Sequence, residues 1–327
     1  GVFWATRGVT RRGSGGGTGL MGFGCAEGQY AFRDAVRDLL ADTCPPEAVR
    51  AGWDADDPWD RDRWSALAEM GVVGLMAPED AGGLGLTEVD LVLLLEEAGR
   101  AALPEPLADT ALLLPLVPGE WQEPIASGRI ALGVASADAT HVVGPVGADF
   151  IVVGDQVFGL PDDAEEQRSV DGSRRLLRVG DVVDGDAVFR LTGDPFDRMA
   201  FGTAATLVGL ARHLIDVTVE YAKERQQFGQ PIGGFQAVKH HLASVLLAVE
   251  FAAPAVHRAA WSLATDQPTV PRDVSMAKAM APPPCGRRRH RPTVSSWRPL
   301  AAPGRRNRAP ERHPGRGPAS ESRMGRR

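Results

Sequence analysis

A seam of apolar residues near the C-terminal third of this 327-residue chain limits its fold more than any other feature. Its members recur three and four residues apart, at Phe235, Val238, Leu242, Val245, Val249, Ala252, Val256, Ala259 and Leu263. That spacing places them on one side of an α-helix of about 30 residues, which needs facing helices to bury it. Pro254 predicts a kink rather than an end, because the seam continues beyond it.

A second helical stretch, over about 204–223, carries a comparable apolar face. Its members are Leu207, Val208, Ala211, Leu214, Ile215 and Thr218. The two stretches meet near Gly229-Gln230-Pro231, which predicts an antiparallel helix pair of the kind that belongs in a bundle.

Residues 27–116 also have a helical pattern. The expected apolar faces are Tyr30, Val36, Leu39 and Leu40 in a first helix, and Trp64, Leu67 and Met70 in a second. Pro45-Pro46 should stop the first helix, and Gly71 should end the second. A turn-rich stretch at 78–85 then precedes an apolar helix over about 87–101.

Between Ile130 and Phe189 the pattern changes to short apolar runs, such as 131–135 and 150–153, separated by Gly, Pro and Asp. This pattern predicts a small β-rich domain. The apolar runs of the chain are too short to cross a bilayer, and the N-terminus lacks a signal-like core. We therefore expect a cytoplasmic protein without a membrane partner.

The two ends of the chain differ from the rest in composition. Residues 1–20 contain a Gly-Ser-Gly-Gly-Gly run and predict a disordered extension, with Met21 as a natural start. The dinucleotide-type spacing at Gly17–Gly22 follows no strand, so it is not interpreted as a nucleotide site. Cys25, Cys44 and Cys285 form no CxxC pair, so neither a disulfide framework nor a zinc site is expected.

Charge is distributed unevenly around the formal net value of −6. Residues 282–327 contain 13 arginines, no lysine and two glutamates, a net +11, whereas the preceding residues (23 basic, 40 acidic) carry −17. This proline- and arginine-rich tail holds too few large apolar residues to build a core. Its composition is what a shifted reading frame in a GC-rich gene would produce.

The most specific motif is Tyr221-Ala222-Lys223-Glu224-Arg225-Gln226-Gln227-Phe228-Gly229-Gln230-Pro231-Ile232. It resembles the Tyr-x-x-x-Arg-x-x-Phe-Gly-x-x-Ile signature of the acyl-CoA dehydrogenases. Two further matches occur in order, Ala77-Pro78-Glu79 with Gly82-Gly83-Leu84-Gly85, and then Glu96-Glu97-Ala98-Gly99-Arg100. The resemblance covers roughly residues 27–281.

The residue types in this motif suit a phosphate-bearing cofactor. An arginine at a helix end can bind a pyrophosphate through two hydrogen bonds, Phe228 offers an apolar face, and Gly229 permits a tight turn. The resemblance implies that Arg225, Gln227 and Phe228 contact FAD bound in a neighbouring subunit. It further implies an acyl-CoA substrate, a homo- or hetero-oligomer and an electron-transfer acceptor.

The implied reaction removes a proton α to a thioester and transfers a hydride from the β carbon to the flavin, which needs a carboxylate base. No catalytic residue is assigned, because the helices after Ala281 that supply the base and an adenine-side motif in many members are replaced by the tail. The acidic, Gly-Ser-rich loop and Trp-Ile-Thr strand of the family's middle domain are also absent. Asp197, which precedes Arg198, is the nearest acid, but a helix-start charge is the favoured interpretation of Asp197.

Two other polar pairs are interpreted as structural. His240 and His241 point about 100° apart on a helix and are therefore not expected to share a metal ion. Glu96-Glu97 is interpreted as a polar helix face.

The expected fold class is α+β, like that of the acyl-CoA dehydrogenases, with a helical N-terminal domain, a small central β domain and an incomplete C-terminal helical bundle. The expected divisions are 1–20, 21–128, 129–192, 193–281 and 282–327. The implied function is that of an acyl-CoA dehydrogenase-like flavoprotein subunit, inactive alone or dependent on a partner. The alternative is a non-catalytic protein whose basic tail binds nucleic acid or a protein partner.

Overall fold

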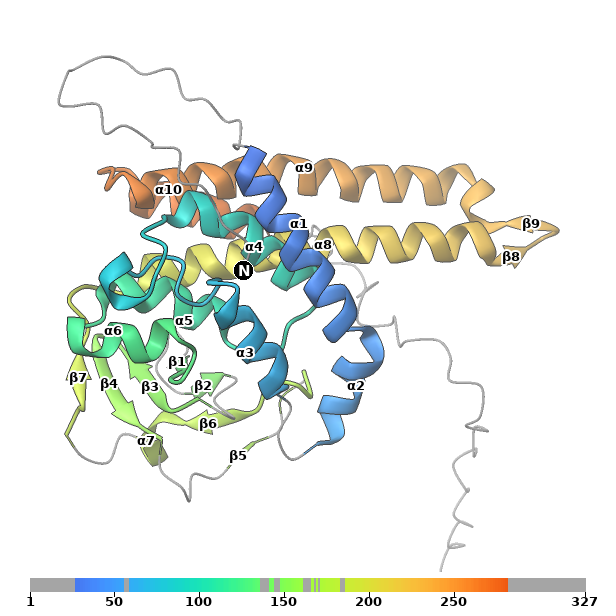
Figure 1. Ribbon diagram of the computed structural model, residues 1–327. Coiled ribbons are helices and arrows are strands. Elements are labelled where there is room, and N and C mark those ends of the chain that lie inside the picture. Colours follow the sequence, from blue (N-terminus) through green and yellow to red (C-terminus); the bar gives the residue numbers. More distant parts are fainter. Residues whose placement is uncertain are drawn as a thin grey trace, which may run out of the picture.

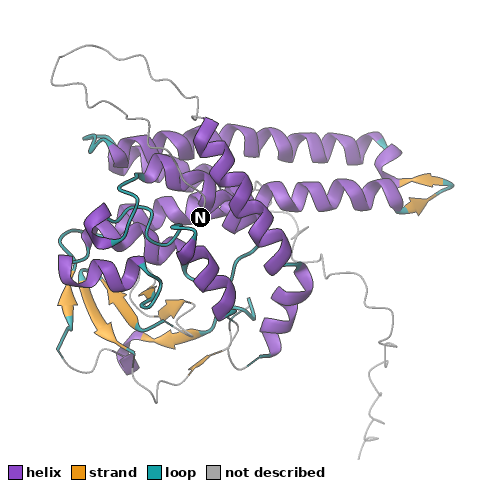
Figure 2. Ribbon diagram, in the orientation of Figure 1, coloured by secondary structure: helices purple, strands orange, loops and turns teal. Residues whose placement is uncertain are grey.

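The computed structural model describes residues 27–55, 59–135, 141–143, 148–160, 166–167, 169, 171–182 and 186–281. A group of helices comes first, a β-sheet lies against it, and a long helical hairpin projects beyond both (Figure 1). Colouring by secondary structure shows helices on one side of the sheet, with the hairpin the most extended part of the described chain (Figure 2). Both chain ends predicted to be irregular, 1–20 and 282–327, lie outside the described residues.

The N-terminal region consists of short helices around one apolar helix. They are α1 (Glu27–Thr43), α2 (Pro46–Asp54), α3 (Arg61–Glu69), η1 (Glu79–Ala81), α4 (Glu88–Arg100), α5 (Leu107–Leu113), η2 (Leu114–Leu116) and α6 (Gly119–Ala126). The helix α4 begins where Thr87 and Asp90 form a capping box, in which each side chain satisfies a free backbone donor of the first turn. Its buried face contacts α1, α8 and α9, so it is the central helix of the molecule.

Two details of the first helix pattern differ from the prediction. Pro45-Pro46 ends α1, but Pro46 also starts α2, because a proline at the first helical position lacks only an N–H that the helix leaves unpaired. Tyr30 is 41% exposed rather than part of the buried face, with the Arg33 guanidinium 4.8 Å from its ring centre.

The middle region forms a seven-stranded sheet among the described residues. Its strands are β1 (Leu132–Ala135), β2 (His141–Val143), β3 (Phe150–Val153), β4 (Gln156–Gly159), β5 (Glu166–Gln167), β6 (Leu176–Arg178) and β7 (Phe189–Arg190), with α7 (Val179–Val182) between the last two. The strand order is β5-β6-β2-β1-β3-β4-β7, in which only β1 and β3 pair in parallel. One face packs on α5 and α6 through a cluster that includes Leu113, Leu132 and Val152.

The C-terminal region is an antiparallel hairpin of α8 (Phe196–Glu224) and α9 (Gln236–Ala264), as the sequence pattern predicts. A two-stranded ribbon, β8 (Gln226–Gln227) and β9 (Gln230–Pro231), and the short η3 (Ile232–Gly234) join them. The last helix, α10 (Val270–Met280), folds back along α9 and also contacts α8. The helix α8 begins eight residues earlier than the predicted position 204, and α9 continues through Pro254 to Ala264.

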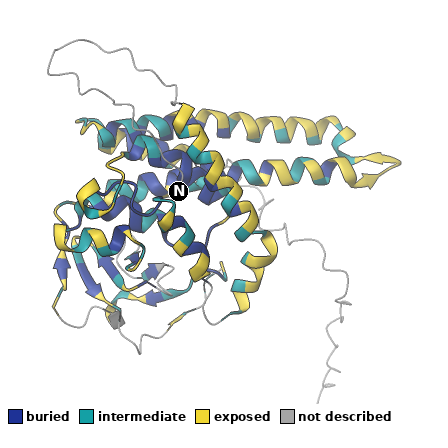
Figure 3. Ribbon diagram, in the orientation of Figure 1, coloured by how far each residue is buried: buried dark blue, intermediate teal, exposed yellow. Residues whose placement is uncertain are grey.

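The apolar seam of α9 is covered unevenly. Its C-terminal half, including Ala252, Val256 and Ala259, is buried, and α9 packs against α4, α8 and α10. Its N-terminal half, next to η3 and facing α8, is less covered, and the seam residues Val238 and Leu242 are half-buried. Burial therefore decreases toward the projecting end of the hairpin (Figure 3).

Apolar residues also lie on the outer faces of the hairpin. Leu214 was predicted on the packed face of α8, but its side chain is 44% exposed. Other exposed apolar residues are Val217 (52%) on the same helix, and Leu247 (58%) and Phe251 (63%) on α9. As a result α9 has an 18-residue window of mean hydropathy 1.3, which by length and composition alone suffices to cross a membrane. Because the buried half of α9 packs against three helices of this chain, we interpret it as a core helix with an uncovered outer face.

The crossing of α4 and α8 depends on two glycines. A Cβ added at Gly99 would lie 1.9 Å from the Thr206 carbonyl oxygen, and one at Gly209 would lie 1.7 Å from the Glu96 carbonyl oxygen. The two backbones therefore approach more closely than any side chain would allow, which fixes where α8 crosses the central helix.

Candidate functional site

The turn between α8 and α9 is built from the signature segment. Arg225 follows the last residue of α8, and its carbonyl oxygen accepts a hydrogen bond of 2.7 Å from the Ile232 N–H. Gln227 pairs with Gln230, and the two residues between them, Phe228 and Gly229, both have positive φ values, 53° and 80°. Such a two-residue turn suits glycine, whereas a positive φ is costly for phenylalanine.

The side chains at this turn are exposed. Phe228 is 93% exposed, with its ring centre 6.1 Å from that of Phe235, and Arg225 and Gln227 are exposed beside it. Among the residues that the structure describes, Arg225 has no ion-pair partner. A strained backbone and an exposed aromatic ring both cost stability, so this combination indicates a binding function. We call Arg225, Gln227 and Phe228 the hairpin tip.

Near the centre of the molecule, Glu96 and Glu97 were interpreted from sequence as a polar helix face, and that interpretation is wrong. Both are buried. Arg212 of α8 donates to Glu96, whose other oxygen lies 2.9 Å from Nε2 of His257 on α9. Arg37 of α1 donates to both oxygens of Glu97, at 2.6 and 2.9 Å. These carboxylates connect α4 to three other helices.

Asp197 and Arg198, at the start of α8, have separate structural roles. Asp197 lies in the first turn, where a carboxylate interacts favourably with the helix dipole, and burial together with the nearby Asp194 raises its pKa. Arg198 donates to the buried Glu88 of α4. Its guanidinium is therefore occupied by an ion pair within the protein, which argues against a substrate contact.

One carboxylate that the sequence analysis did not single out is Asp109 on α5. Burial raises its pKa to about 6, with a smaller opposing effect from Arg174. A signal was present in the sequence, because Asp109 is the single charged residue in the otherwise apolar stretch from Leu107 to Leu116.

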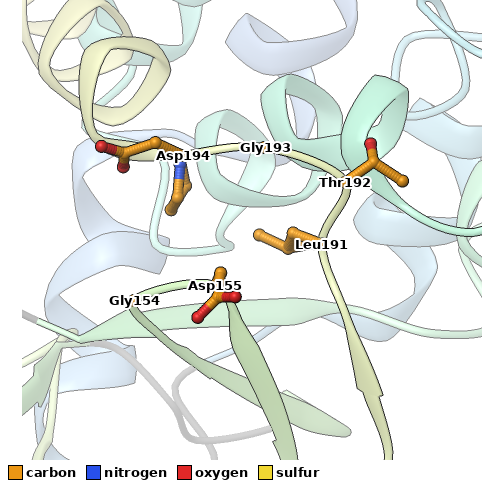
Figure 4. A pocket seen from close by; sticks show the side chains of 7 residues that line it. Gly154, Asp155, Leu191, Thr192, Gly193 and Asp194 are labelled. Atoms are coloured by element: carbon orange, nitrogen blue, oxygen red, sulfur yellow. The ribbon is translucent and has the colours of Figure 1, made fainter.

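A pocket of about 480 Å³ lies between the β3–β4 turn and the segment that leads into α8 (Figure 4). Its carboxylates have structural contacts: Asp155 binds Arg190 at 3.2 Å, and Asp194 accepts a 2.9 Å hydrogen bond from the Phe196 N–H. The pocket lies at the opposite end of α8 from Arg225. It therefore does not complete a site with the hairpin tip.

The histidine pair does not form a metal site with the residues around it. His240 and His241 are both exposed on α9, and no group of three or more potential His, Cys, Asp or Glu ligands gathers within the described part of the chain.

Comparison with known proteins identifies the family. Residues 26–114 match the profile "Acyl-CoA dehydrogenase, N-terminal domain", and residues 189–285 match "Acyl-CoA dehydrogenase, C-terminal domain". The chain belongs to the acyl-CoA dehydrogenase family. The two matches cover more than half of the chain and include the signature segment, so the resemblance inferred from its motifs is confirmed.

Individual acyl-CoA dehydrogenases match over about two thirds of this chain. IpdE2 of Mycobacterium tuberculosis is 34% identical over 235 residues, which are 68% of this chain and 72% of that relative. FadE34 of the same organism is also 34% identical over 248 residues, but these make up only 34% of its length.

Solved structures confirm the acyl-CoA dehydrogenase fold. A Tcur3481–Tcur3483 steroid ACAD variant superposes with a TM-score of 0.68 at 24% identity, over 78% of this chain and 82% of that one. The ChsE4–ChsE5 complex of Mycobacterium tuberculosis gives 0.65 at 22% identity, over 80% and 84%. At these identities the likeness concerns the fold alone.

The hairpin tip fits one part of the flavin cofactor that the family implies. A forked cation, an amide and an aromatic face are the groups that bind a pyrophosphate and pack on an apolar ring edge. All three are exposed at the projecting end of the hairpin, so they are available to a cofactor held by another chain.

Proposed function

We propose that this chain is a flavoprotein subunit that takes part in the α,β-dehydrogenation of an acyl-CoA thioester within an oligomer. In this proposal its hairpin tip contacts FAD bound mainly by a neighbouring subunit. The observation that carries the proposal is the exposure of Arg225 and Phe228 at the end of a projecting hairpin, with Phe228 in a strained backbone conformation.

The outer faces of the hairpin support an oligomer. Leu246, Leu247 and Phe251 on α9, and Leu214 and Val217 on α8, are between 44% and 63% exposed. An apolar surface of this kind on a projecting element is typical of a protein–protein interface. Two structural neighbours, the Tcur3481–Tcur3483 protein and the ChsE4–ChsE5 complex, have two-component names, which favours a second acyl-CoA dehydrogenase chain as the partner.

In this proposal the flavin, this chain and the partner chain have different chemical roles. When bound, the flavin accepts the hydride, and the protein supplies alignment and exclusion of water. Arg225 would neutralise pyrophosphate charge and fix the cofactor's position, while Phe228 would cover an apolar part of it. Within the described residues, the acid at the start of α8 has a structural role, so we propose that the partner supplies the catalytic base. An electron-transfer protein would reoxidise the flavin, and we place the assembly in the cytoplasm.

The hairpin tip provides the test. Arg225→Ala should lower flavin retention by the purified assembly about tenfold or more, because a charge-assisted contact contributes about 1.5–3 kcal/mol. Lys223→Ala is the matched control, since Lys223 is an exposed cation two residues away that pairs with Glu220 at 2.6 Å. Flavin content would be measured by absorbance after dialysis. Equal retention in the Arg225 variant and the control would refute the shared-site proposal.

A further inference from the structure

Both helices of the hairpin are held by one buried residue of α4. One carboxylate oxygen of Glu96 accepts a hydrogen bond from Arg212 of α8, and the other lies 2.9 Å from Nε2 of His257 on α9. The backbone carbonyl of Glu96 lies at the close crossing, where a Cβ added at Gly209 would be 1.7 Å away. Because Glu96 is only 5% exposed, water and salt screen these contacts little.

Three ion pairs join α4 to α8 along their length. The first, between Glu88 and Arg198, lies at the base of α8 and uses a buried carboxylate. The last, between Arg100 and Asp216 at 2.5 Å, is 35% and 57% exposed, so it holds the two helices weakly. The middle pair is that of Glu96. Among these three pairs, Glu96 is therefore the buried attachment nearest to the hairpin tip, and it is the carboxylate that also reaches α9.

The distance from this attachment to the tip amplifies any change of angle. From Arg212 to Arg225 the chain continues as a helix for about 20 Å, and the hairpin projects beyond the rest of the described chain (Figure 1). Crossing angles of packed helices scatter by about 15–20° around their preferred values, so a tilt of about 5° is small, yet over this length it would move Arg225 by about 2 Å. Binding groups must be held to within about 0.5 Å of their productive positions.

We propose that Glu96 is a positioning residue for the flavin site of the neighbouring subunit. By fixing both helices of the hairpin where they leave the core, it aims Arg225 and Phe228 at the cofactor without touching it. This inference rests on the proposed function and adds to it a residue outside the hairpin tip.

The residue next to Glu96 provides a matched control. Glu97 is also buried on α4, and Arg37 donates to both of its oxygens, at 2.6 and 2.9 Å. Its partner lies on α1, outside the hairpin. Glu96→Gln and Glu97→Gln therefore make the same chemical change at adjacent buried positions, but only the first loosens the base of the hairpin.

The affinity of the purified assembly for FAD tests the proposal without requiring turnover. The flavin-free assembly would be titrated with FAD, and quenching of flavin fluorescence would be followed at a temperature and concentration at which every variant is folded and associated. Glu96→Gln should raise the Kd for FAD about threefold to tenfold, because a misaligned Arg225 loses part of its contact. Glu97→Gln should bind FAD like the wild type. His257→Ala, at a partly exposed position, removes only the α9 contact and should also raise the Kd, which keeps the test valid if Glu96→Gln fails to fold.

A combined variant separates positioning from a general loss of stability. Adding Glu96→Gln to the tip variant Arg225→Ala/Phe228→Ala should change the Kd by less than about twofold, since Glu96 acts through contacts that are already removed. Effects that multiply, or equal losses in Glu96→Gln and Glu97→Gln, would overturn the inference alone. A tip variant that binds FAD like the wild type would overturn the proposed function as well.

Discussion

At the scale of single residues, the carboxylates of this chain differ in how they are stabilised. Asp273 accepts hydrogen bonds from Ser262, Thr269, Arg258 and Arg272, and although burial opposes the effect, these contacts lower its pKa well below the usual range. Glu96 joins α4 to α8 and α9 through Arg212 and His257. Within the described part of the chain Asp109 accepts no hydrogen bond and forms no ion pair, and burial raises its pKa.

Removing the charge of Glu96 should destabilise the chain. Glu96→Gln removes the buried carboxylate that Arg212 and His257 share and leaves Arg212 only its longer contact with the exposed Glu250, at 3.6 Å. We therefore expect a loss of about 1–3 kcal/mol in the free energy of unfolding. Glu220→Gln, which alters an exposed pair with Lys223, should change it by less than about 0.5 kcal/mol. Urea unfolding followed by circular dichroism would measure both, and similar losses would contradict the connecting role of Glu96.

The pH dependence of stability should reveal Asp109. Its pKa is about 6 when folded against an ordinary 3.8, so its stabilising effect is complete below 3.8 and is lost as the pH rises through 6. Asp109→Asn remains neutral throughout. It should therefore stabilise the chain by about 1–3 kcal/mol near pH 8 and have little effect near pH 4. Unfolding curves at the two pH values would give the difference, and an equal effect at both would show that the Asp109 pKa is not raised.

At the scale of helices, the sequence pattern predicts where each helix lies in the chain better than it predicts which helices pack against one another. The seam of α9 and the apolar run of α4 identify both helices, since periodicity reports which face of a helix is buried. Periodicity cannot report that Glu96 and Glu97 face inward, because their arginine partners are distant in sequence and their burial depends on where α8 and α1 cross. For the same reason the motif locates Arg225 and Phe228 at a turn but does not show their exposure.

The crossing of α4 and α8, where Gly99 and Gly209 let the two backbones approach, gives a test at this scale. Gly209→Ala would place a methyl group 1.7 Å from the Glu96 carbonyl oxygen, so α4 and α8 must separate, at an expected cost of about 3 kcal/mol or more. Gly28→Ala in α1 is the control, because no atom lies within 4 Å of the added Cβ. That change should be neutral or stabilise by up to about 1 kcal/mol. Comparable melting temperatures for the two variants would refute the close approach.

At the scale of the whole molecule, the described residues form a buried apolar core, but they also leave large apolar side chains exposed on the hairpin. The helix α9 packs against α4, α8 and α10, and its seam is buried in the C-terminal half but only half-buried toward the projecting end. The sequence analysis expected an incomplete C-terminal helical bundle around this seam. In the structure α4 and α10 cover its buried half, and the larger exposed apolar side chains lie on other faces of the same helices.

Association should depend on those outer faces. Phe251→Ser removes a 63% exposed ring from α9 and should weaken self-association or partner binding about tenfold or more, with little change in the stability of the isolated chain. Lys239→Ser, at an exposed polar position of the same helix, is the control. Sedimentation velocity over a concentration series would report both, and identical behaviour would exclude this face from the interface.

Activity should require more than this chain. Purified alone, it should show no acyl-CoA oxidation with a dye acceptor, because the proposed shared site needs a base and cofactor contacts from a partner. Adding the partner chain and FAD should restore turnover. Sustained turnover by the chain alone, after stringent purification, would direct attention back to Asp197.

Each helix of the hairpin has 29 residues, so the tip lies about 43 Å from the base of α8 at 1.5 Å per residue. In the proposed assembly, Arg225 and Phe228 serve the FAD site of the neighbouring subunit. Natural selection on these two residues therefore acts through the activity of that subunit. A chain that lost its own catalytic groups would still be retained in the genome for what it provides to its neighbour. Two defective copies, one damaged at the tip and the other at its own cofactor site, would complement each other when expressed in the same cell.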